Sequence, residues 1–121
     1  MLFITVDGDD IGQKISACYL NDDLESLSLL NDFVQDTVNK IATYLRSAGF
    51  RVIFCAADGV AAYSDAAYTD LAQIYARISS FSEGRLTFSA GVGESLRDSY
   101  FALLFAKSSG KACIYDFRDV T

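Results

Sequence analysis

Acidic residues gather directly after the first apolar segment of the chain. Residues 2–6 read LFITV, and Asp7, Asp9 and Asp10 follow within four positions, with Gly8 between the first two. Like charges this close repel one another, so a fold tolerates them where they face solvent or a cation. Carboxylates suit Mg²⁺ and Mn²⁺, and a glycine lets a backbone carbonyl approach such an ion closely. The stretch is therefore either a solvated turn or half of a metal site.

Another acidic residue, Asp58, lies in a predicted hairpin. Residues 50–57 (FRVIFCAA) and 60–63 (VAAY) have the composition of strands. The Asp58–Gly59 pair between them is a typical two-residue turn of type I′, in which both central residues need positive φ. Asp58 alone is explained by the turn.

The order of the predicted elements brings the two acidic stretches together. After the strand at residues 2–6, DGDDIG is a loop or the start of a helix. The later predictions are a helix with an apolar stripe from Leu27 to Leu45 that ends near Gly49, a helical stripe from Tyr68 to Ile78, a strand over 85–92, a helix over 99–111 that ends at Gly110, and a strand over 112–117.

This order is β-α-β-β-α-β followed by α-β, which indicates an α+β, ferredoxin-like domain with an added C-terminal helix and strand. In that plan the third strand lies between the first two and runs antiparallel to both. Asp7 and Asp58 should therefore meet at one edge of the sheet. We expect them to be the catalytic carboxylates and, with the Gly8 carbonyl, to hold Mg²⁺ or Mn²⁺ for phosphoryl or nucleotidyl transfer.

Two lysines close the last predicted helix. Lys107 lies in its final turn and Lys111 follows it. A lysine here can simply complement the helix dipole. Beside a carboxylate–metal site, Lys107 is also a suitable point charge for a triphosphate, with Lys111 and Lys14 as weaker candidates. No GxxxxGK[ST] motif occurs, so a P-loop ATPase is not supported.

The composition of the chain limits the kinds of site and partner that it can have. The 121 residues suit one domain, residues 1–121, and the net charge of −6 argues against extended contact with a nucleic-acid backbone. The chain has no histidine and no CxxC motif, which argues against a zinc site or a histidine base. Cys55 and Cys113 lie in apolar runs and are predicted to be buried thiols. No signal peptide or membrane span is evident, so the expected location is cytoplasmic.

Four motifs in order resemble the palm domains of GGDEF diguanylate cyclases and of CRISPR polymerases. They are ITVDGDDIG, FCAADGVAAY, SAGVGES and YFALLFAKSSGK. The resemblance spans nearly the whole chain and is closest to the minimal CRISPR polymerase family, which consists of stand-alone palm domains tied to anti-phage signalling.

The resemblance implies roles for individual residues. Asp7 and Asp58 would bind metal, and Lys107 would contact the triphosphate. The hairpin signature in relatives is two glycines followed by two acids, whereas this chain has Ala56, Ala57, Asp58 and Gly59. Further residues expected around the nucleotide are Gly8, Asp9, Asp10, Ala57, Gly59 and Lys111. Asp9 or Asp10 could supply the carboxylate that Gly59 lacks.

The implied activity is the joining of nucleoside triphosphates, with ATP favoured, into a cyclic dinucleotide or short cyclic oligonucleotide. One small palm binds one nucleotide, so we expect a homodimer that needs no template nucleic acid and no membrane and that signals to a downstream effector. Two alternatives stay open: a class III-like cyclase that makes a cyclic mononucleotide, and a degenerate palm that acts as a nucleotide-binding sensor. Gly59 favours the sensor.

Overall fold

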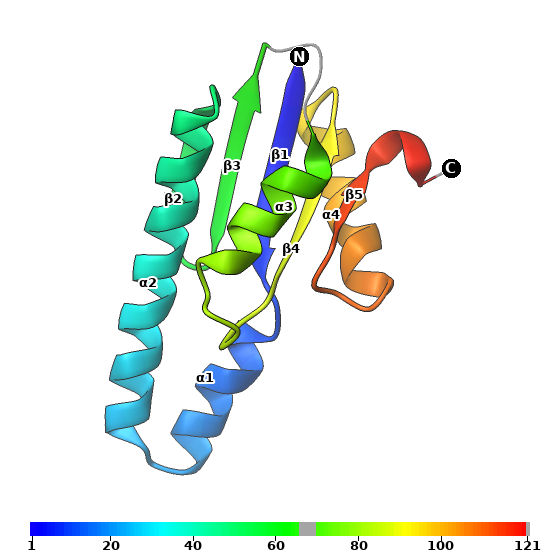
Figure 1. Cartoon of the computed structure of the whole chain (residues 1–121). Helices are drawn as coiled ribbons and strands as arrows, with labels where there is room; N and C mark the ends of the chain where they lie inside the picture. The colour runs from blue at the N-terminus through cyan, green and yellow to red at the C-terminus, as the bar shows by residue number, and fades with distance from the viewer. Residues whose placement is uncertain (66–69, 121) are drawn as a thin grey trace.

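A computed structural model describes residues 1–65 and 70–120 (Figure 1). Its elements are β1 (Leu2–Gly8), α1 (Ile11–Leu20), α2 (Leu24–Ser47), β2 (Arg51–Ala56), β3 (Gly59–Ser64), α3 (Leu71–Ser80), β4 (Phe88–Gly93), α4 (Leu96–Ser108), β5 (Ile114–Asp116) and the 3₁₀ helix η1 (Phe117–Asp119). The strands form one sheet in the order β2-β3-β1-β4-β5.

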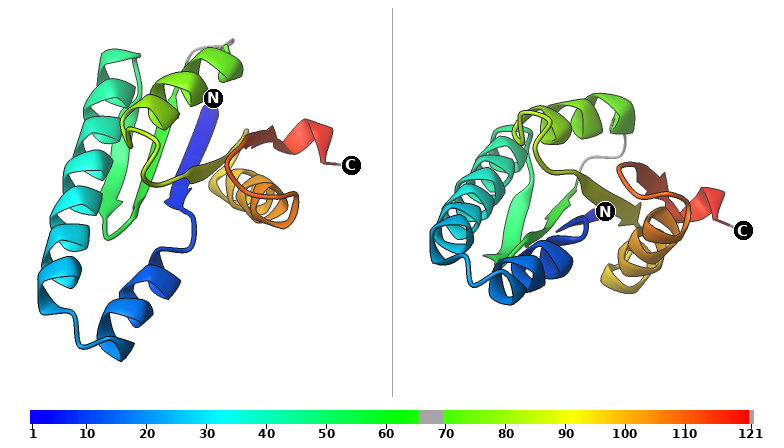
Figure 2. Two further views of the ribbon diagram at one scale, coloured as in Figure 1. Left: turned by 60° about the horizontal axis from the view of Figure 1, so that its bottom comes forward. Right: turned by 90° about the horizontal axis from the view of Figure 1, so that it is seen from below.

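The sheet has the predicted connectivity. β3 lies between β2 and β1 and is antiparallel to both, β1 is antiparallel to β4, and β5 is parallel to β4. The chain is therefore an α+β, ferredoxin-like palm with an added C-terminal helix and strand, as its sequence predicted. Helices α2 and α3 cover one face of the sheet, and α4 lies on the other (Figure 2).

The segment between β1 and α2 differs from the prediction. It contains a separate helix, α1, which forms a hairpin with α2 that extends beyond the end of the sheet (Figure 1). The chain reverses at Asn21–Asp22, where Asp22 has φ 49°. Asp23 then caps α2 by accepting a hydrogen bond from the Ser26 amide at 3.0 Å. Ile11, Ile15 and Tyr19 recur at every fourth residue, which is a helical spacing that the prediction did not include.

The β2–β3 turn is shifted by one residue from the prediction. Ala56 pairs with Gly59, so Ala57 and Asp58 are the central residues. Ala57 has φ 51°, while neither Asp58 nor Gly59 has positive φ. The predicted type I′ turn centred on Asp58–Gly59 is therefore wrong, although Asp58 does lie in the turn.

The main apolar core lies between the sheet and the helices α2 and α3. Its largest fully buried side chains include Ile4, Ile41, Leu45, Ile78 and Phe88. The α2 stripe is as predicted, with its buried part running from Val34 to Leu45. Tyr68, the first residue of the other predicted stripe, lies outside the described residues.

The cysteines are less buried than predicted. Cys55 and Cys113 are only partly buried, because β2 is an edge strand and Cys113 lies in the loop before β5. Each thiol donates to a backbone carbonyl, of Val38 and Ala106 respectively. In the described part of the chain, no helix is both long and apolar enough to cross a membrane.

Helix α4 packs unusually close to β4 because glycines face it. A Cβ at Gly91 would lie 2.2 Å from the Leu103 nitrogen, and one at Gly93 would lie 2.8 Å from the Ser99 nitrogen. Thr5 of β1 and Ser99 of α4 share a hydrogen bond of 3.0 Å between their hydroxyls. This close packing brings the last turn of α4 to the carboxyl end of β1.

Candidate active site

Asp7 and Asp58 converge at the edge of the sheet where β1 ends. Asp7 pairs with Gly59 in the ladder, and the Gly8 amide donates to the Asp58 carbonyl at 2.9 Å. A Cβ at Gly8 would lie 3.3 Å from Asp58 Oδ2 and 2.7 Å from the Ile11 side chain. Glycine at position 8 therefore leaves the space that the Asp58 carboxylate uses beside β1.

Lys107 joins this pair from α4. Its Nζ donates to the Gly8 carbonyl at 2.8 Å and lies 2.9 Å from Asp7 Oδ2 and 3.3 Å from Asp9 Oδ1. Burial tends to lower the pKa of Lys107. The contacts with Asp7 and Asp9 outweigh this effect, so the pKa of the lysine is raised. Burial, together with the charges of Asp58 and Asp9, raises the pKa of Asp7 despite the contact with Lys107.

Asp9 is almost fully buried and hydrogen-bonded on both oxygens. Thr87 Oγ1 donates to its Oδ2 and Ser89 Oγ to its Oδ1, each at 2.7 Å, and the Ala112 amide donates to Oδ2 at 3.1 Å. Burial opposes ionisation, but these bonds and Lys107 outweigh it and lower the pKa of Asp9. With so many donors, Asp9 is an anchor that holds Lys107 and the loop after α4, and its oxygens are not free to replace the acid that Gly59 lacks.

The sequence did not predict that Thr87, Ser89 and Ala112 donate hydrogen bonds to Asp9. The two hydroxyls lie two positions apart at the start of a strand that should pair with β1, so alternation could have placed them on the same face as Asp7. Ala112 had no such signal, because its amide reaches Asp9 only through the left-handed turn at Lys111 and Ala112, with φ values of 64° and 50°.

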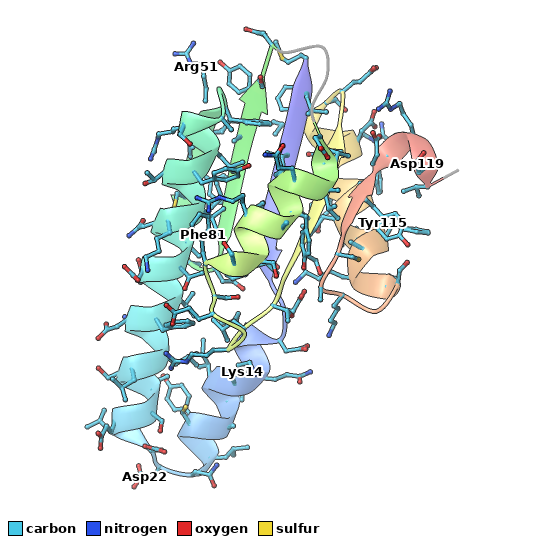
Figure 3. All side chains as sticks on the ribbon, in the orientation of Figure 1. Lys14, Asp22, Arg51, Phe81, Tyr115 and Asp119 are labelled. Carbon is cyan, nitrogen blue, oxygen red and sulfur yellow. The ribbon has the colours of Figure 1, made fainter. Side chains whose placement is uncertain are left out.

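Asp10 and Lys111 lie at the rim of the site. Lys111 Nζ forms an ion pair with Asp10 Oδ1, and both side chains are partly exposed. Such a pair contributes little to stability and is readily exchanged for another anion. Lys14 is exposed in α1, next to the same end of the sheet (Figure 3).

Ala57 and Gly59, two hairpin positions that depart from the signature of the resembling families, differ in their surroundings. Ala57 is exposed at the tip, whereas Gly59 is buried. A Cβ at Gly59 would lie 3.1 Å from the Val6 carbonyl and 3.3 Å from Asp7 Oδ1. A side chain at position 59 would therefore press on the Val6 carbonyl and on Asp7, which would have to shift by a few tenths of an ångström.

A pocket of about 660 Å³ opens beside Asp58, between α1, α2 and the hairpin tip. Its walls are mainly apolar, with Ile15, Leu27 and Val34 among them, and the turn residues Ala57 and Asp58 close one end. Other polar side chains in the lining are Ser28, Asn31 and Gln35 of α2 and Tyr19 of α1. The sequence did not predict this pocket, because it depends on the α1–α2 hairpin.

The donor set fits a hard divalent cation. Asp7, Asp58 and the Gly8 carbonyl offer only oxygen, and the Lys107 ammonium already lies against two of these groups. Among the described residues, no group of three or more acidic, cysteine or histidine side chains could hold a metal ion. Mg²⁺ typically takes one or two carboxylates and completes its shell with water and substrate phosphates, which suits this pair.

Comparisons with known proteins agree on the kind of domain. Residues 3–117 match the family model described as the minimal CRISPR polymerase domain. A solved structure, a Csm1–Csm4 cassette in complex with one ATP, has the same fold with a TM-score of 0.66 and 17% identity. The match covers 93% of this chain but only 20% of that chain. A comparison with curated proteins finds no match.

Proposed function

The chain belongs to the family of minimal CRISPR polymerase domains, and from this premise we propose that it is a nucleotidyltransferase that joins nucleoside triphosphates into a cyclic dinucleotide or short cyclic oligonucleotide. The observation that carries the proposal is the convergence of Asp7, Asp58 and Lys107 beside a mainly apolar pocket of about 660 Å³. Following the resemblance to its family, the product would be a signal in anti-phage defence that a downstream effector reads.

The pocket between α1 and α2 is the proposed place of the base. Its volume lies within the range of small-molecule sites, and its apolar walls suit a flat aromatic ring. Asn31 and Gln35 carry amides, which can pair with the donor and acceptor of an adenine edge. This favours ATP, and the similar Csm1–Csm4 structure was solved with one ATP.

The triphosphate would lie between the end of β1 and the start of α1. Lys107 is the cation that contacts the carboxylate of Asp7, and Lys111 forms an ion pair with Asp10 nearby. The Asp10 side chain does not cap α1, so the first amides of this helix are available to phosphate oxygens.

In each joining step, a ribose hydroxyl of one nucleotide attacks the α-phosphate of another. A P–O bond forms, the bond to the leaving pyrophosphate breaks, and the hydroxyl proton passes to solvent. Mg²⁺ or Mn²⁺ bound by Asp7, the Gly8 carbonyl and Asp58 would supply the positive charge that activates the hydroxyl and offsets the phosphates. Asp9 holds Lys107 in place, and Lys107 neutralises the leaving pyrophosphate.

A second nucleotide must come from elsewhere, because one chain carries one such carboxylate pair and one such pocket in its described residues. We therefore include a homodimer in the proposal, with each protomer presenting one nucleotide. The net charge of −6 makes a template nucleic acid an unsuitable partner.

Two observations favour a second candidate, a nucleotide-binding sensor without turnover. Gly59 lacks the acid found in relatives, and Lys107 lies against the Asp7 and Gly8 oxygens that a catalytic ion would need. In such a sensor, bound nucleotide would be read by a partner rather than converted.

The test is mass spectrometry of products after incubation with ATP, GTP, CTP and UTP, singly and mixed, with Mg²⁺ or Mn²⁺. We expect a cyclic dinucleotide from the wild type and a loss of more than about a hundredfold in Asp58→Asn. Asp22→Asn is the matched control, because Asp22 is exposed at the far tip of the α1–α2 hairpin (Figure 3).

Each other outcome has a defined meaning. Undiminished product from Asp58→Asn contradicts the metal assignment. A cyclic mononucleotide indicates the cyclase alternative, and bound but unconverted nucleotide with either metal indicates the sensor.

A further inference from the structure

A second cavity lies where the α1–α2 hairpin meets the loop between α3 and β4. It has a volume of about 270 Å³ and is lined by Lys14 of α1, by residues of α2, and by Arg85 and Leu86 of the loop. Among the described residues, Leu30 is the only one that lines both this cavity and the pocket of about 660 Å³. The larger pocket is closed by the β2–β3 turn and the smaller one by the α3–β4 loop, so they are separate. The smaller one is called the Lys14–Arg85 cavity below.

The Lys14–Arg85 cavity holds two cations without an acidic partner. The chain has 16 acidic and 10 basic residues, and Lys107 and Lys111 each contact a carboxylate. In the part of the chain that the structure describes, neither Lys14 nor Arg85 forms an ion pair. Two like charges that line one small cavity repel each other unless an anion lies between them. The cavity therefore has the charge of an anion site.

The guanidinium group of Arg85 is held in place by its surroundings. Its Cζ lies 4.0 Å from the centroid of the Phe33 ring, and Phe33 in turn packs against the apolar core. The Arg85 amide donates to the Ser82 carbonyl at 2.9 Å, which also orders the backbone of the loop. A guanidinium stacked on a ring keeps its N–H edge available, and this edge can bind two oxygens of an anion at once. Arg85 thus presents a positioned pair of donors.

The charge, walls and size of the cavity indicate a small organic phosphate. Lys14 adds a point charge to the two-oxygen edge of Arg85, and together they match the double charge of a phosphate monoester. Leucine side chains of α2 and of the loop provide an apolar wall for the rest of the molecule. The volume is slightly below the usual range of small-molecule sites, so the ligand must be small. Glu25 and Glu83 are near neighbours in sequence of the lining residues and would repel an extended nucleic-acid backbone.

The loop that carries Arg85 also contacts the buried carboxylate of the catalytic corner. Thr87 follows Arg85 by two positions, and its hydroxyl donates to Asp9 Oδ2 at 2.7 Å. The Asp9 amide donates in return to the Thr87 carbonyl at 2.9 Å. Asp9 Oδ1 lies 3.3 Å from Lys107 Nζ. An anion that fixes Arg85 therefore restrains the loop on which the position of Asp9 depends.

We propose that the Lys14–Arg85 cavity is a second ligand site, separate from the Asp7–Asp58 corner, that binds the phosphate group of a small phosphomonoester and restrains Asp9 when it is occupied. Lys14 then serves this cavity rather than the triphosphate. The inference does not rest on the proposed function, because its evidence comes from a cavity that contains neither of the two carboxylates.

Binding is measured with inorganic phosphate and phenyl phosphate as probes, by titration of the full chain followed in ¹H–¹⁵N NMR spectra. The amides of Ser26 and Arg85 report on the cavity, since both residues line it. We expect saturable shifts of both amides, with phenyl phosphate bound several-fold more tightly because its ring contacts the leucine wall. Arg85→Gln and Lys14→Met should each weaken binding at least about fivefold, as judged from Ser26.

Two further variants are the controls. Arg46→Gln removes an exposed arginine in the last turn of α2, far along the helix from the cavity lining, and should leave the affinity unchanged. Lys107→Met removes the lysine of the Asp7–Asp58 corner and should leave the shifts of Ser26 and their midpoint unchanged. Far-UV circular dichroism checks that each variant is folded.

Hydrogen exchange of the Asp9 amide tests the link to the catalytic corner. A ligand that holds the loop should slow this exchange by about tenfold when phenyl phosphate is present at ten times its dissociation constant. At the same concentration the effect in Arg85→Gln should be about threefold or less, because the weakened site is then only partly occupied.

Each other result contradicts a defined part of the inference. Shifts that do not saturate, or an affinity that survives both Arg85→Gln and Lys14→Met, overturn the site. Loss of the Ser26 shifts in Lys107→Met would put the phosphate in the triphosphate corner and overturn it as well. An Asp9 exchange rate that ignores the ligand refutes the restraint of Asp9. None of these measurements uses nucleotide turnover, so their failure leaves the proposed function standing.

Discussion

Lys107 is the residue on which the proposed chemistry at the end of β1 depends. Its ammonium group touches the Gly8 carbonyl and both the Asp7 and Asp9 carboxylates. The proposed function asks the same lysine to bind triphosphate and the same Asp7 and Gly8 oxygens to bind a divalent cation. Lysine and cation therefore compete for oxygen ligands until a nucleotide arrives and gives the lysine phosphate oxygens instead.

This competition can be measured with Lys107→Met. Without nucleotide, removal of the ammonium should strengthen Mn²⁺ binding by about tenfold, equivalent to ~1.4 kcal/mol. Affinity for a non-hydrolysable ATP analogue should fall by a similar factor, because the triphosphate loses a cation. Electron paramagnetic resonance of Mn²⁺ and calorimetry report the two affinities, and Lys40→Met, on the exposed face of α2, is the control. Equal Mn²⁺ affinity in variant and wild type would refute the competition.

Asp9 is predicted to stabilise the fold rather than to react. Asp9→Asn keeps the shape but loses charge-assisted bonds from Thr87, Ser89 and Lys107, which should lower the free energy of unfolding by about 2 kcal/mol at pH 7. Because the pKa of Asp9 is lowered in the folded chain, its contribution is complete above the ordinary value of 3.8 and is lost as the pH falls through the folded value.

Urea unfolding at several pH values checks this prediction. The gap between wild type and Asp9→Asn should be constant near neutrality and should close in acid. A gap that grows as the pH falls would have the wrong sign and would contradict the role of the Asp9 carboxylate.

At the scale of elements, the packing of α4 on β4 decides where Lys107 lies. Gly91 and Gly93 let the helix backbone come close to the strand, and the Thr5–Ser99 bond ties it to β1. The loop after α4 is then tied back to Asp9 through Ala112. A helix a few ångströms farther from the sheet would carry Lys107 out of reach of Asp7.

Gly91→Ala tests this packing against a matched substitution in another element. A Cβ at Gly91 would lie 2.2 Å from the Leu103 nitrogen, so alanine should cost about 3 kcal/mol of stability. Gly12→Ala in α1 meets nothing within 4 Å and should instead stabilise the helix by about 0.5–1 kcal/mol. Thermal unfolding of both variants measures the contrast; similar melting temperatures would contradict the close approach of α4.

At the scale of the whole molecule, an excess of negative charge is combined with exposed apolar side chains. Two copies of net charge −6 repel one another, whereas exposed apolar side chains such as Phe54 and Tyr100 favour association. The balance between these terms depends on ionic strength, because salt screens the repulsion and leaves the apolar contact intact.

Salt should therefore strengthen self-association. Raising NaCl from about 50 mM to about 300 mM shortens the Debye length to less than half, and the dimer dissociation constant should fall several-fold. Sedimentation velocity at both concentrations measures the change. A dimer that weakens with salt would indicate an interface built on ion pairs instead.

The sequence by itself determined the order of the strands and of the helices other than α1, the palm fold and the meeting of Asp7 with Asp58. These follow from local patterns, namely strand composition, helical stripes and a hairpin signal, which the ferredoxin-like plan then places on one edge. Only the tertiary structure decided that the hairpin turns at Ala57–Asp58, that Asp9 is a buried anchor, that Lys107 lies on the carboxylates, and that a pocket opens between α1 and α2. Each of these depends on the contact of segments distant in sequence, such as α4 against Gly91, and short-range patterns do not encode how closely such segments pack.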